Sequence, residues 1–97
     1  MESPKIVHTS AKKRFEIYLG RAVIGKSYYR LEAGRRVFTH TEIDPDYQGH
    51  GLASQLLQFA LDETRGEGLR VIALCPTAAA FIAKRPEYHD MIEQQDA

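Results

Sequence analysis

The chain has 97 residues, of which 43% are hydrophobic and 27% are charged, and its formal net charge is zero. This length predicts one domain with a modest core, and the charge balance argues against a general binder of nucleic acid or of membrane surfaces. No apolar run approaches the ~20 residues of a membrane span, which excludes a simple transmembrane protein.

Residues 1–13 are polar and aperiodic, which predicts a flexible N-terminal segment. Three runs rich in aromatic and β-branched residues follow, and they predict strands at Arg14–Leu19, at Ala22–Glu32 with Gly25 as a candidate bulge, and at Val37–Ile43. Short turns separate these runs, so we expect an antiparallel β-meander.

The hydrophobic period then changes from that of a strand to that of a helix. Leucine and alanine recur every three or four positions, which predicts a helix from about Gly51 to Glu67, with Gly68 at positive φ behind it. Leu69–Cys75 is nearly all apolar and predicts a buried strand, parallel to the third strand because a helical crossover precedes it. Pro76–Arg85 predicts a second helix, which Pro86 ends.

Together these elements predict a mixed α+β fold, a β-meander followed by α-β-α. The domain is expected to span residues 14–92, with a flexible tail at 93–97.

The segment "QGHGLA", Gln48–Ala53, lies between the third strand and the first helix. A helix N-terminus presents unpaired N–H groups and a positive dipole, and glycine lets the backbone approach an anion closely. Gln48, Gly49, His50, Gly51, Leu52 and Ala53 therefore form a candidate phosphate cradle. A glycine-rich connector without a ligand explains the same spacing.

The strand before this loop carries a histidine and a carboxylate two residues apart. If side chains alternate regularly, Phe38, His40 and Glu42 share one face of the strand. His40 and Glu42 would then form a candidate acid/base pair, or simply the polar side of a strand that faces solvent.

Cys75 is the single cysteine, so no intramolecular disulfide forms, and this composition fits a reducing, cytoplasmic location. Pro76 suits the first position of a helix, which places Cys75 at the cap where the helix dipole favours a thiolate. The alternative is a small hydrophobic residue that ends a buried strand. The four histidines and one cysteine lack metal-ligand spacing, so we expect no metal site, and His8 and His89 are expected in flexible ends.

Three separated motifs, "HTEIDPDYQGHGLASQLL", "GLRVIALCP" and "RPEY", resemble a minimal family of GNAT-like N-acetyltransferases of roughly a hundred residues. The resemblance covers about Phe15 to Met91. It implies a truncated GNAT fold, acetyl-CoA as cosubstrate gripped by the glycine loop, and His40, Glu42 and Cys75 as the catalytic residues.

The activity that this resemblance implies is acetyl transfer to an amine acceptor, with Cys75 as a candidate acyl carrier; the alternative is a non-catalytic module that binds coenzyme A. We expect a monomer or weak homodimer with no nucleic-acid or membrane partner. One departure concerns the second helix, where many GNAT enzymes have a Phe-Tyr pair that supplies a tyrosine acid and this chain has Phe81-Ile82. Tyr88 is expected to pack at the edge of the core.

Overall fold

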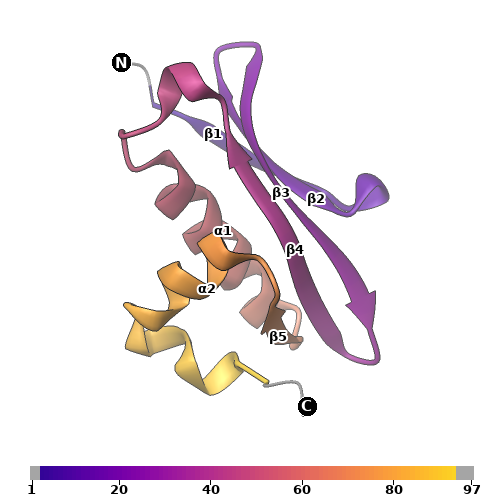
Figure 1. Cartoon of the computed structure of the whole chain (residues 1–97). Helices are drawn as coiled ribbons and strands as arrows, with labels where there is room; N and C mark the ends of the chain where they lie inside the picture. Colours follow the sequence, from indigo (N-terminus) through magenta and orange to yellow (C-terminus); the bar gives the residue numbers. More distant parts are fainter. Residues whose placement is uncertain (1–2, 94–97) are drawn as a thin grey trace.

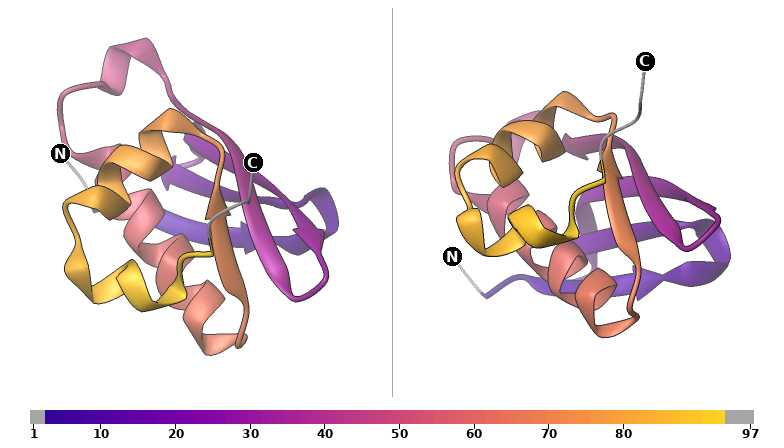
Figure 2. Two further views of the ribbon diagram at one scale, coloured as in Figure 1. Left: turned by 60° about the horizontal axis from the view of Figure 1, so that its bottom comes forward. Right: turned by 90° about the horizontal axis from the view of Figure 1, so that it is seen from below.

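The computed structural model describes residues 3–93, which form a five-stranded sheet with both α-helices on one face (Figures 1 and 2). The elements in chain order are β1 (Lys5–Thr9), β2 (Arg14–Leu19), β3 (Ala22–Glu32), β4 (Arg35–Ile43), α1 (Leu52–Gly66), β5 (Arg70–Ala73) and α2 (Pro76–Ala83). A short 3₁₀ helix, Pro86–Met91, follows. The strands lie side by side in sequence order; β1 to β4 are antiparallel and β5 is parallel to β4. The predicted fold class is therefore confirmed.

The N-terminal segment is the main correction to the predicted layout. Lys5–Thr9 is a strand that pairs along β2, with Ile6 opposite Ile17. The prediction of a flexible segment is therefore wrong for the described part of residues 1–13, and residues 1–2 lie outside the described residues. The sheet begins before residue 14, the predicted start of the domain. Only Ile6 and Val7 of β1 are apolar, and a run of two apolar residues is too short to indicate a strand.

The C-terminal end of the described chain also makes contacts. The Glu93 N–H donates to the Val71 carbonyl at 2.8 Å, and the Glu93 carboxylate pairs with Arg35 at 2.9 Å. Glu93 therefore belongs to the folded structure, although the predicted tail began there. Residues 94–97, the rest of that predicted tail, lie outside the described residues.

The apolar stripe of α1 covers the sheet. Its leucines Leu52, Leu56, Leu57 and Leu61 are at most 3% exposed, as the helical spacing predicted. Each such side chain contributes about 1.5–3 kcal/mol through its burial. Gly68 follows the helix with a φ of 73°, as predicted. Among the helices of residues 3–93, none is both long and apolar enough to cross a membrane.

A bulge at Thr39 overturns the predicted alternation of side chains along β4. Tyr29 lies opposite Phe38 and Tyr28 lies opposite His40, so Thr39 is the extra residue. Phe38 is fully buried in the core, whereas the side chains of His40 and Glu42 are 61% and 51% exposed. The prediction that Phe38 shares a face with His40 and Glu42 is therefore wrong.

Gly25 lies beside a second bulge, in β3, and is needed for close packing. Between Ile17↔Gly25 and Tyr18↔Val23 the extra residue is Ile24, next to the predicted position. A Cβ on Gly25 would lie 2.5 Å from the Ile43 side chain and 2.9 Å from that of Ile17. Glycine therefore allows the centre of the sheet to pack tightly.

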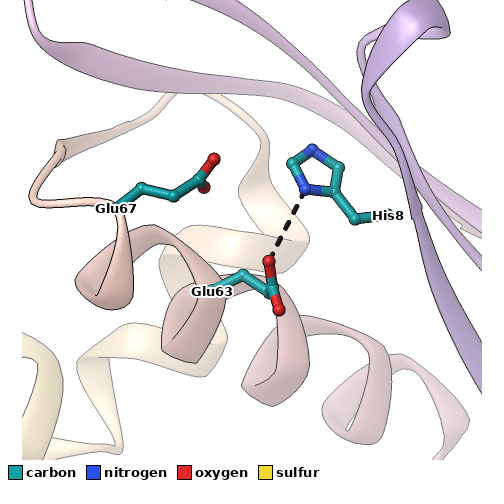
Figure 3. A group of neighbouring side chains, drawn as sticks. All are labelled: His8, Glu63 and Glu67. Atoms are coloured by element: carbon teal, nitrogen blue, oxygen red, sulfur yellow. Dashed lines mark ion pairs between the residues drawn. The ribbon is translucent and has the colours of Figure 1, made fainter.

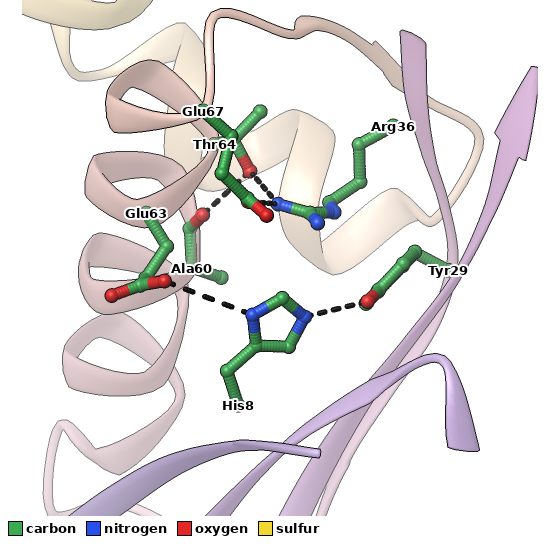
Figure 4. Close-up of polar contacts among 7 residues, drawn as sticks. All are labelled: His8, Tyr29, Arg36, Ala60, Glu63, Thr64 and Glu67. Carbon is green, nitrogen blue, oxygen red and sulfur yellow. Dashed lines mark hydrogen bonds and ion pairs between the residues drawn. The ribbon is translucent and has the colours of Figure 1, made fainter. Parts of the chain in front are cut away.

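A polar network ties the N-terminal strand and β4 to the end of α1 (Figures 3 and 4). The His8 ring stacks on Phe15 with 4.1 Å between ring centroids, and its Nε2 hydrogen bonds with the Tyr29 hydroxyl. Its Nδ1 lies 3.7 Å from the Glu63 carboxylate. The expectation that His8 and His89 lie in flexible ends is therefore wrong, because His89 lies in the 3₁₀ helix Pro86–Met91 and its Nε2 hydrogen bonds with the Ile82 carbonyl at 2.9 Å.

Arg36 is the buried charge of this network. It is 2% exposed, and its Nη1 donates to the Glu67 carboxylate at 2.6 Å and to the Thr64 hydroxyl at 2.9 Å. The Thr64 hydroxyl in turn donates to the Ala60 carbonyl. The guanidinium carbon lies 4.3 Å from the Tyr29 ring centroid, so a cation–π contact adds to the ion pair. Removing Glu67 would leave a buried charge without its counter-ion.

We predict that His8 makes stability fall as the pH drops below neutrality. Burial, and then the Arg36 charge, lower the pKa of His8 in the folded state, so below the unfolded pKa of about 6.5 the unfolded chain binds the extra proton first. Urea unfolding between pH 8 and pH 5.5 should show a smaller loss of stability for His8→Gln than for the wild type. The matched control is His50→Gln, in an exposed loop, which should keep the wild-type slope. Equal slopes for His8→Gln and wild type would contradict this assignment.

Candidate functional site

A cavity of about 440 Å³ lies where the end of β4, the glycine loop, the first turn of α1 and Thr77 of α2 meet. Among the predicted cofactor residues, those that line it are Gln48, Gly49, Gly51, Leu52 and Ala53. His50 is exposed and is absent from this lining. The structure therefore brings most of the predicted cradle to one concave site.

The backbone of the loop requires its two glycines. Gly49 and Gly51 have φ angles of 84° and 74°, a left-handed conformation that L-residues seldom adopt. Gly51 immediately precedes α1, and its carbonyl accepts the first helical hydrogen bond, from Gln55. The N–H groups in the first turn of α1 have no hydrogen-bond partner within the helix. Residues Gly51 to Ser54 line the cavity, so these N–H groups are potential donors to an anion bound there.

Gln48 has a structural partner. Its side-chain amide donates to the Ile43 carbonyl at 3.1 Å, which ties the loop to the end of β4. The predicted role of this amide as a phosphate donor stays a prediction. The loop is further shaped by Asp44, whose carboxylate accepts from the Asp46 N–H at 2.9 Å.

Beside this cavity, strand β4 extends beyond the point where its pairing with the parallel strand β5 ends. The ladder to β5 ends where Phe38 meets Ala73, and the N–H groups of Leu74 and Cys75 both donate to the Phe38 carbonyl at 3.0 Å. Strand β4 continues to Ile43. Within residues 3–93, no strand pairs with this last part of β4 on its β5 side. Apart from the Ile43 carbonyl, which accepts from Gln48, the main-chain groups that this edge turns toward the β5 side are therefore available at the wall of the cavity.

Cys75 occupies the N-cap of α2, with Pro76 in the first helical turn, as predicted. Burial by itself raises the pKa of the Cys75 thiol. The Thr41 hydroxyl and the N–H groups of Ala78 and Thr77 hydrogen bond to the sulfur and outweigh that effect, so the net pKa lies below the usual value. The residue is 2% exposed, and the cavity lining contains Thr41 and Thr77 but not Cys75. These hydrogen bonds favour the thiolate form of the Cys75 sulfur, which lies behind Thr41 and Thr77 of the cavity wall.

His40 and Glu42 lie on the opposite, helix-free face of the sheet. Their side chains meet at 3.2 Å between His40 Nε2 and Glu42 Oε2, so the predicted pair does form. The His40 ring also stacks on Tyr28, with centroids 6.0 Å apart. Cys75 belongs to the core on the helix face. The structure therefore pairs His40 with Glu42 but does not place His40 beside Cys75.

A second cavity, of about 340 Å³, continues along the groove between α1 and α2. It shares Ala53, Ser54 and Thr77 with the first cavity and ends at Lys84 and Arg85. The sequence contained no signal for this extension, because the pairing of the two helices is a tertiary feature. The same is true of Thr41 and Thr77, which surround the Cys75 sulfur.

The place of the expected tyrosine acid in α2 is apolar. Phe81 and Ile82 are both buried. Tyr88 packs in the core, as predicted, and its hydroxyl donates to Asp62 at 2.8 Å. Burial and this carboxylate raise the pKa of Tyr88 to about 12, which makes it a poor proton donor at neutral pH.

One group of side chains outside the cavity offers metal-ligand atoms. Atoms of His8, Glu63 and Glu67 lie within 4.8 Å of one another (Figure 3). Arg36 already neutralises Glu67 at 2.6 Å, so a cation bound there would meet a buried positive charge. This geometry fits an ion-pair network better than a metal site, and the expectation of no metal stays a prediction.

Comparisons with known proteins bear on this site. A family model described as "GCN5-related N-acetyl-transferase" matches residues 14–91. The fold is similar to the solution NMR structure of a GCN5-like protein from Staphylococcus aureus, with a TM-score of 0.74 and 21% identity over 99% of this chain and 94% of that chain. A search of curated proteins gave no match.

We predict that Thr41→Val raises the pKa of the Cys75 thiol, because it removes the hydroxyl that hydrogen bonds to the sulfur. The ultraviolet absorbance of the thiolate, followed against pH and corrected with Cys75→Ala for the ionisation of the five tyrosines, reports this value because the chain has one cysteine. Thr39→Val is the matched control: Thr39 lies two residues away on the same strand, is exposed, and should leave the pKa unchanged. A lower or unaltered pKa in Thr41→Val would contradict the assignment.

Proposed function

The chain belongs to the family of GCN5-related N-acetyltransferases, and we propose that it transfers the acetyl group of acetyl-CoA to an amine. The observation that carries this proposal is the junction of two binding features at one cavity. A glycine-shaped helix N-terminus favours anions, and the unpaired edge of β4 offers main-chain hydrogen bonds. Acetyl-CoA needs both, since its pyrophosphate is anionic and its pantetheine arm carries two amides.

The first turn of α1 would hold the pyrophosphate. Among the described residues that line the first cavity, none is a lysine or an arginine, so N–H groups and the helix dipole supply the positive potential. The pantetheine amides would pair with the edge of β4 near Thr41–Ile43, as an added strand does. Coenzyme A carries one further phosphate besides its pyrophosphate. The side chains of Lys84 and Arg85, at the end of the second cavity, would supply positive charge for it.

In the proposed mechanism, the first nucleophile is the Cys75 thiolate. It attacks the thioester carbonyl carbon; a C–S bond to Cys75 forms, the bond to coenzyme A breaks, and the coenzyme leaves as its thiolate. The amine then attacks the acetyl carbon, a C–N bond forms, and the Cys75 thiolate leaves. His40 accepts the proton that the amine releases, and Glu42 supports the imidazolium. Because His40 and Cys75 lie on opposite faces of the sheet, the amine would have to reach both of them past the end of β4 that β5 leaves unpaired.

A second candidate function is a module that binds coenzyme A without turnover. The observation that favours it is the separation of the candidate groups, since His40 is largely exposed on one face and Cys75 is buried on the other. Binding would then rest on the same loop and edge. Turnover distinguishes the two functions.

We predict that acetyl-CoA binding depends on Gly51. In isothermal titration, Gly51→Asp should weaken binding at least about tenfold, because a carboxylate would face the pyrophosphate. Gly68→Asp is the matched control, because the two glycines share the same backbone strain and the same open surroundings. Their φ angles are 74° and 73°, and at each of them an added Cβ would have no described atom within 4 Å. Absence of binding by the wild type at millimolar ligand would reject the proposal, and so would equal binding by Gly51→Asp.

We also predict that Cys75 carries the acetyl group during turnover. Intact-mass spectrometry after incubation with acetyl-CoA and an acid quench should show one acetyl group at Cys75, and His40→Ala should slow transfer to a generic amine by about 100-fold. Cys75→Ala should remove both the adduct and the transfer. Full activity of Cys75→Ala would exclude the covalent route, and wild-type protein that binds acetyl-CoA without any turnover would support the binding module.

A further inference from the structure

We infer that Tyr28 is a positioning residue for His40, an inference that rests on the proposed function because His40 is the base there. Tyr28 of β3 lies directly opposite His40 of β4 in the sheet. The two rings stack with centroids 6.0 Å apart and an angle of 25° between their planes. Stacked rings at this separation attract one another, so Tyr28 limits the orientations of the His40 ring.

The bulge at Thr39 creates this pair. In a regular ladder, Tyr28 would face Thr39, because Tyr29 faces Phe38. The Thr39 hydroxyl donates to the Tyr28 carbonyl at 3.3 Å, which ties the extra residue to β3. The bulge at Thr39 therefore both places His40 on the open face and brings it next to the ring of Tyr28.

A row of side chains across three strands supports Tyr28 from its other side. Arg14 of β2 lies opposite Tyr28, and its guanidinium carbon is 5.9 Å from the Tyr28 ring centroid. Glu16 fixes that guanidinium through a hydrogen bond from Nε at 2.8 Å and a contact with Nη2 at 2.7 Å. Arg14, Tyr28 and His40 therefore form one stacked row on the helix-free face.

Glu42 supplies the remaining restraint on His40. When the His40 Nε2–H donates to the Glu42 carboxylate, the lone pair of the neutral ring lies on Nδ1. Glu42 thereby selects the tautomer and Tyr28 fixes the plane of the ring. A side chain that is 61% exposed would otherwise sample several rotamers, and only a fraction of them would accept the proton.

The test compares Tyr28→Leu, which removes the ring but keeps an apolar residue in the strand, with the conservative Tyr28→Phe. We expect Tyr28→Leu to lower kcat about tenfold while kcat/KM for acetyl-CoA stays unchanged, because His40 acts in the second half-reaction, with the amine. Tyr28→Phe should keep kcat within about twofold. Tyr18→Leu is the control and should keep kcat, because Tyr18 lies on the same face but its hydroxyl bonds to Glu16 Oε1, whereas Arg14 bonds to Glu16 Oε2. Urea unfolding of each variant checks the fold.

A second readout needs no activity. The His40 ring proton resonances, assigned by their loss in His40→Gln, should shift in Tyr28→Leu because the ring current disappears, and should stay close to wild type in Tyr28→Phe. If His40→Ala retains full kcat, the proposed role of His40 fails. If His40→Ala loses turnover while Tyr28→Leu keeps both kcat and the wild-type resonances, or if Tyr28→Phe is as damaging as Tyr28→Leu, the inference about Tyr28 is overturned.

Discussion

The divergence of β4 from β5 beyond Phe38 is the constraint on which the rest of this site depends. Both N–H groups after β5, those of Leu74 and Cys75, converge on the Phe38 carbonyl, so β5 stops pairing there and the chain turns into α2. One residue later, the bulge at Thr39 reverses the faces of β4. Because of these two adjacent irregularities, the end of β4 has no neighbouring strand on its β5 side among residues 3–93, and a cavity lies beside it. A regular parallel ladder would have closed that space.

The two faces of the sheet have different chemistry as a result. On the helix face, Thr41 lies against the Cys75 sulfur and the N-terminus of α1 meets the cavity. On the open face, His40 is held between Tyr28 and Glu42. The buried Arg36–Glu67 pair and the His8 contacts lie at the opposite end of α1, where they join β1 and β4 to the helix. Stability and the proposed chemistry therefore rest on separate groups of side chains.

Periodicity predicted most of the fold because α1 and the central strands bury one face each. It failed at β1, whose residues include a histidine and a threonine and whose partners are supplied by the tertiary fold. It failed again at Thr39, since a bulge inserts one residue without any signature in composition. That single residue decides that Phe38 and His40 lie on opposite faces.

The sequence predicted those features of the candidate site that depend on local backbone conformation. Gly49 and Gly51 adopt positive φ, and Cys75 caps a helix that begins with proline, so the local sequence carries both features. The ring of Tyr28 against His40, the hydroxyl of Thr41 at the sulfur and the groove that leads to Lys84 arise from pairing between distant segments. No pattern within one segment could have predicted those contacts.

In the proposed function, one cavity holds the coenzyme between the glycine loop and the end of β4 that β5 leaves unpaired. An NMR titration of backbone amides with coenzyme A tests it most directly, because each N–H reports on its own surroundings. If the coenzyme binds there, the largest shifts fall on Gly49 to Ser54 and on Thr41 to Ile43. Shifts centred on another part of the chain, or no shifts at millimolar coenzyme, would contradict it.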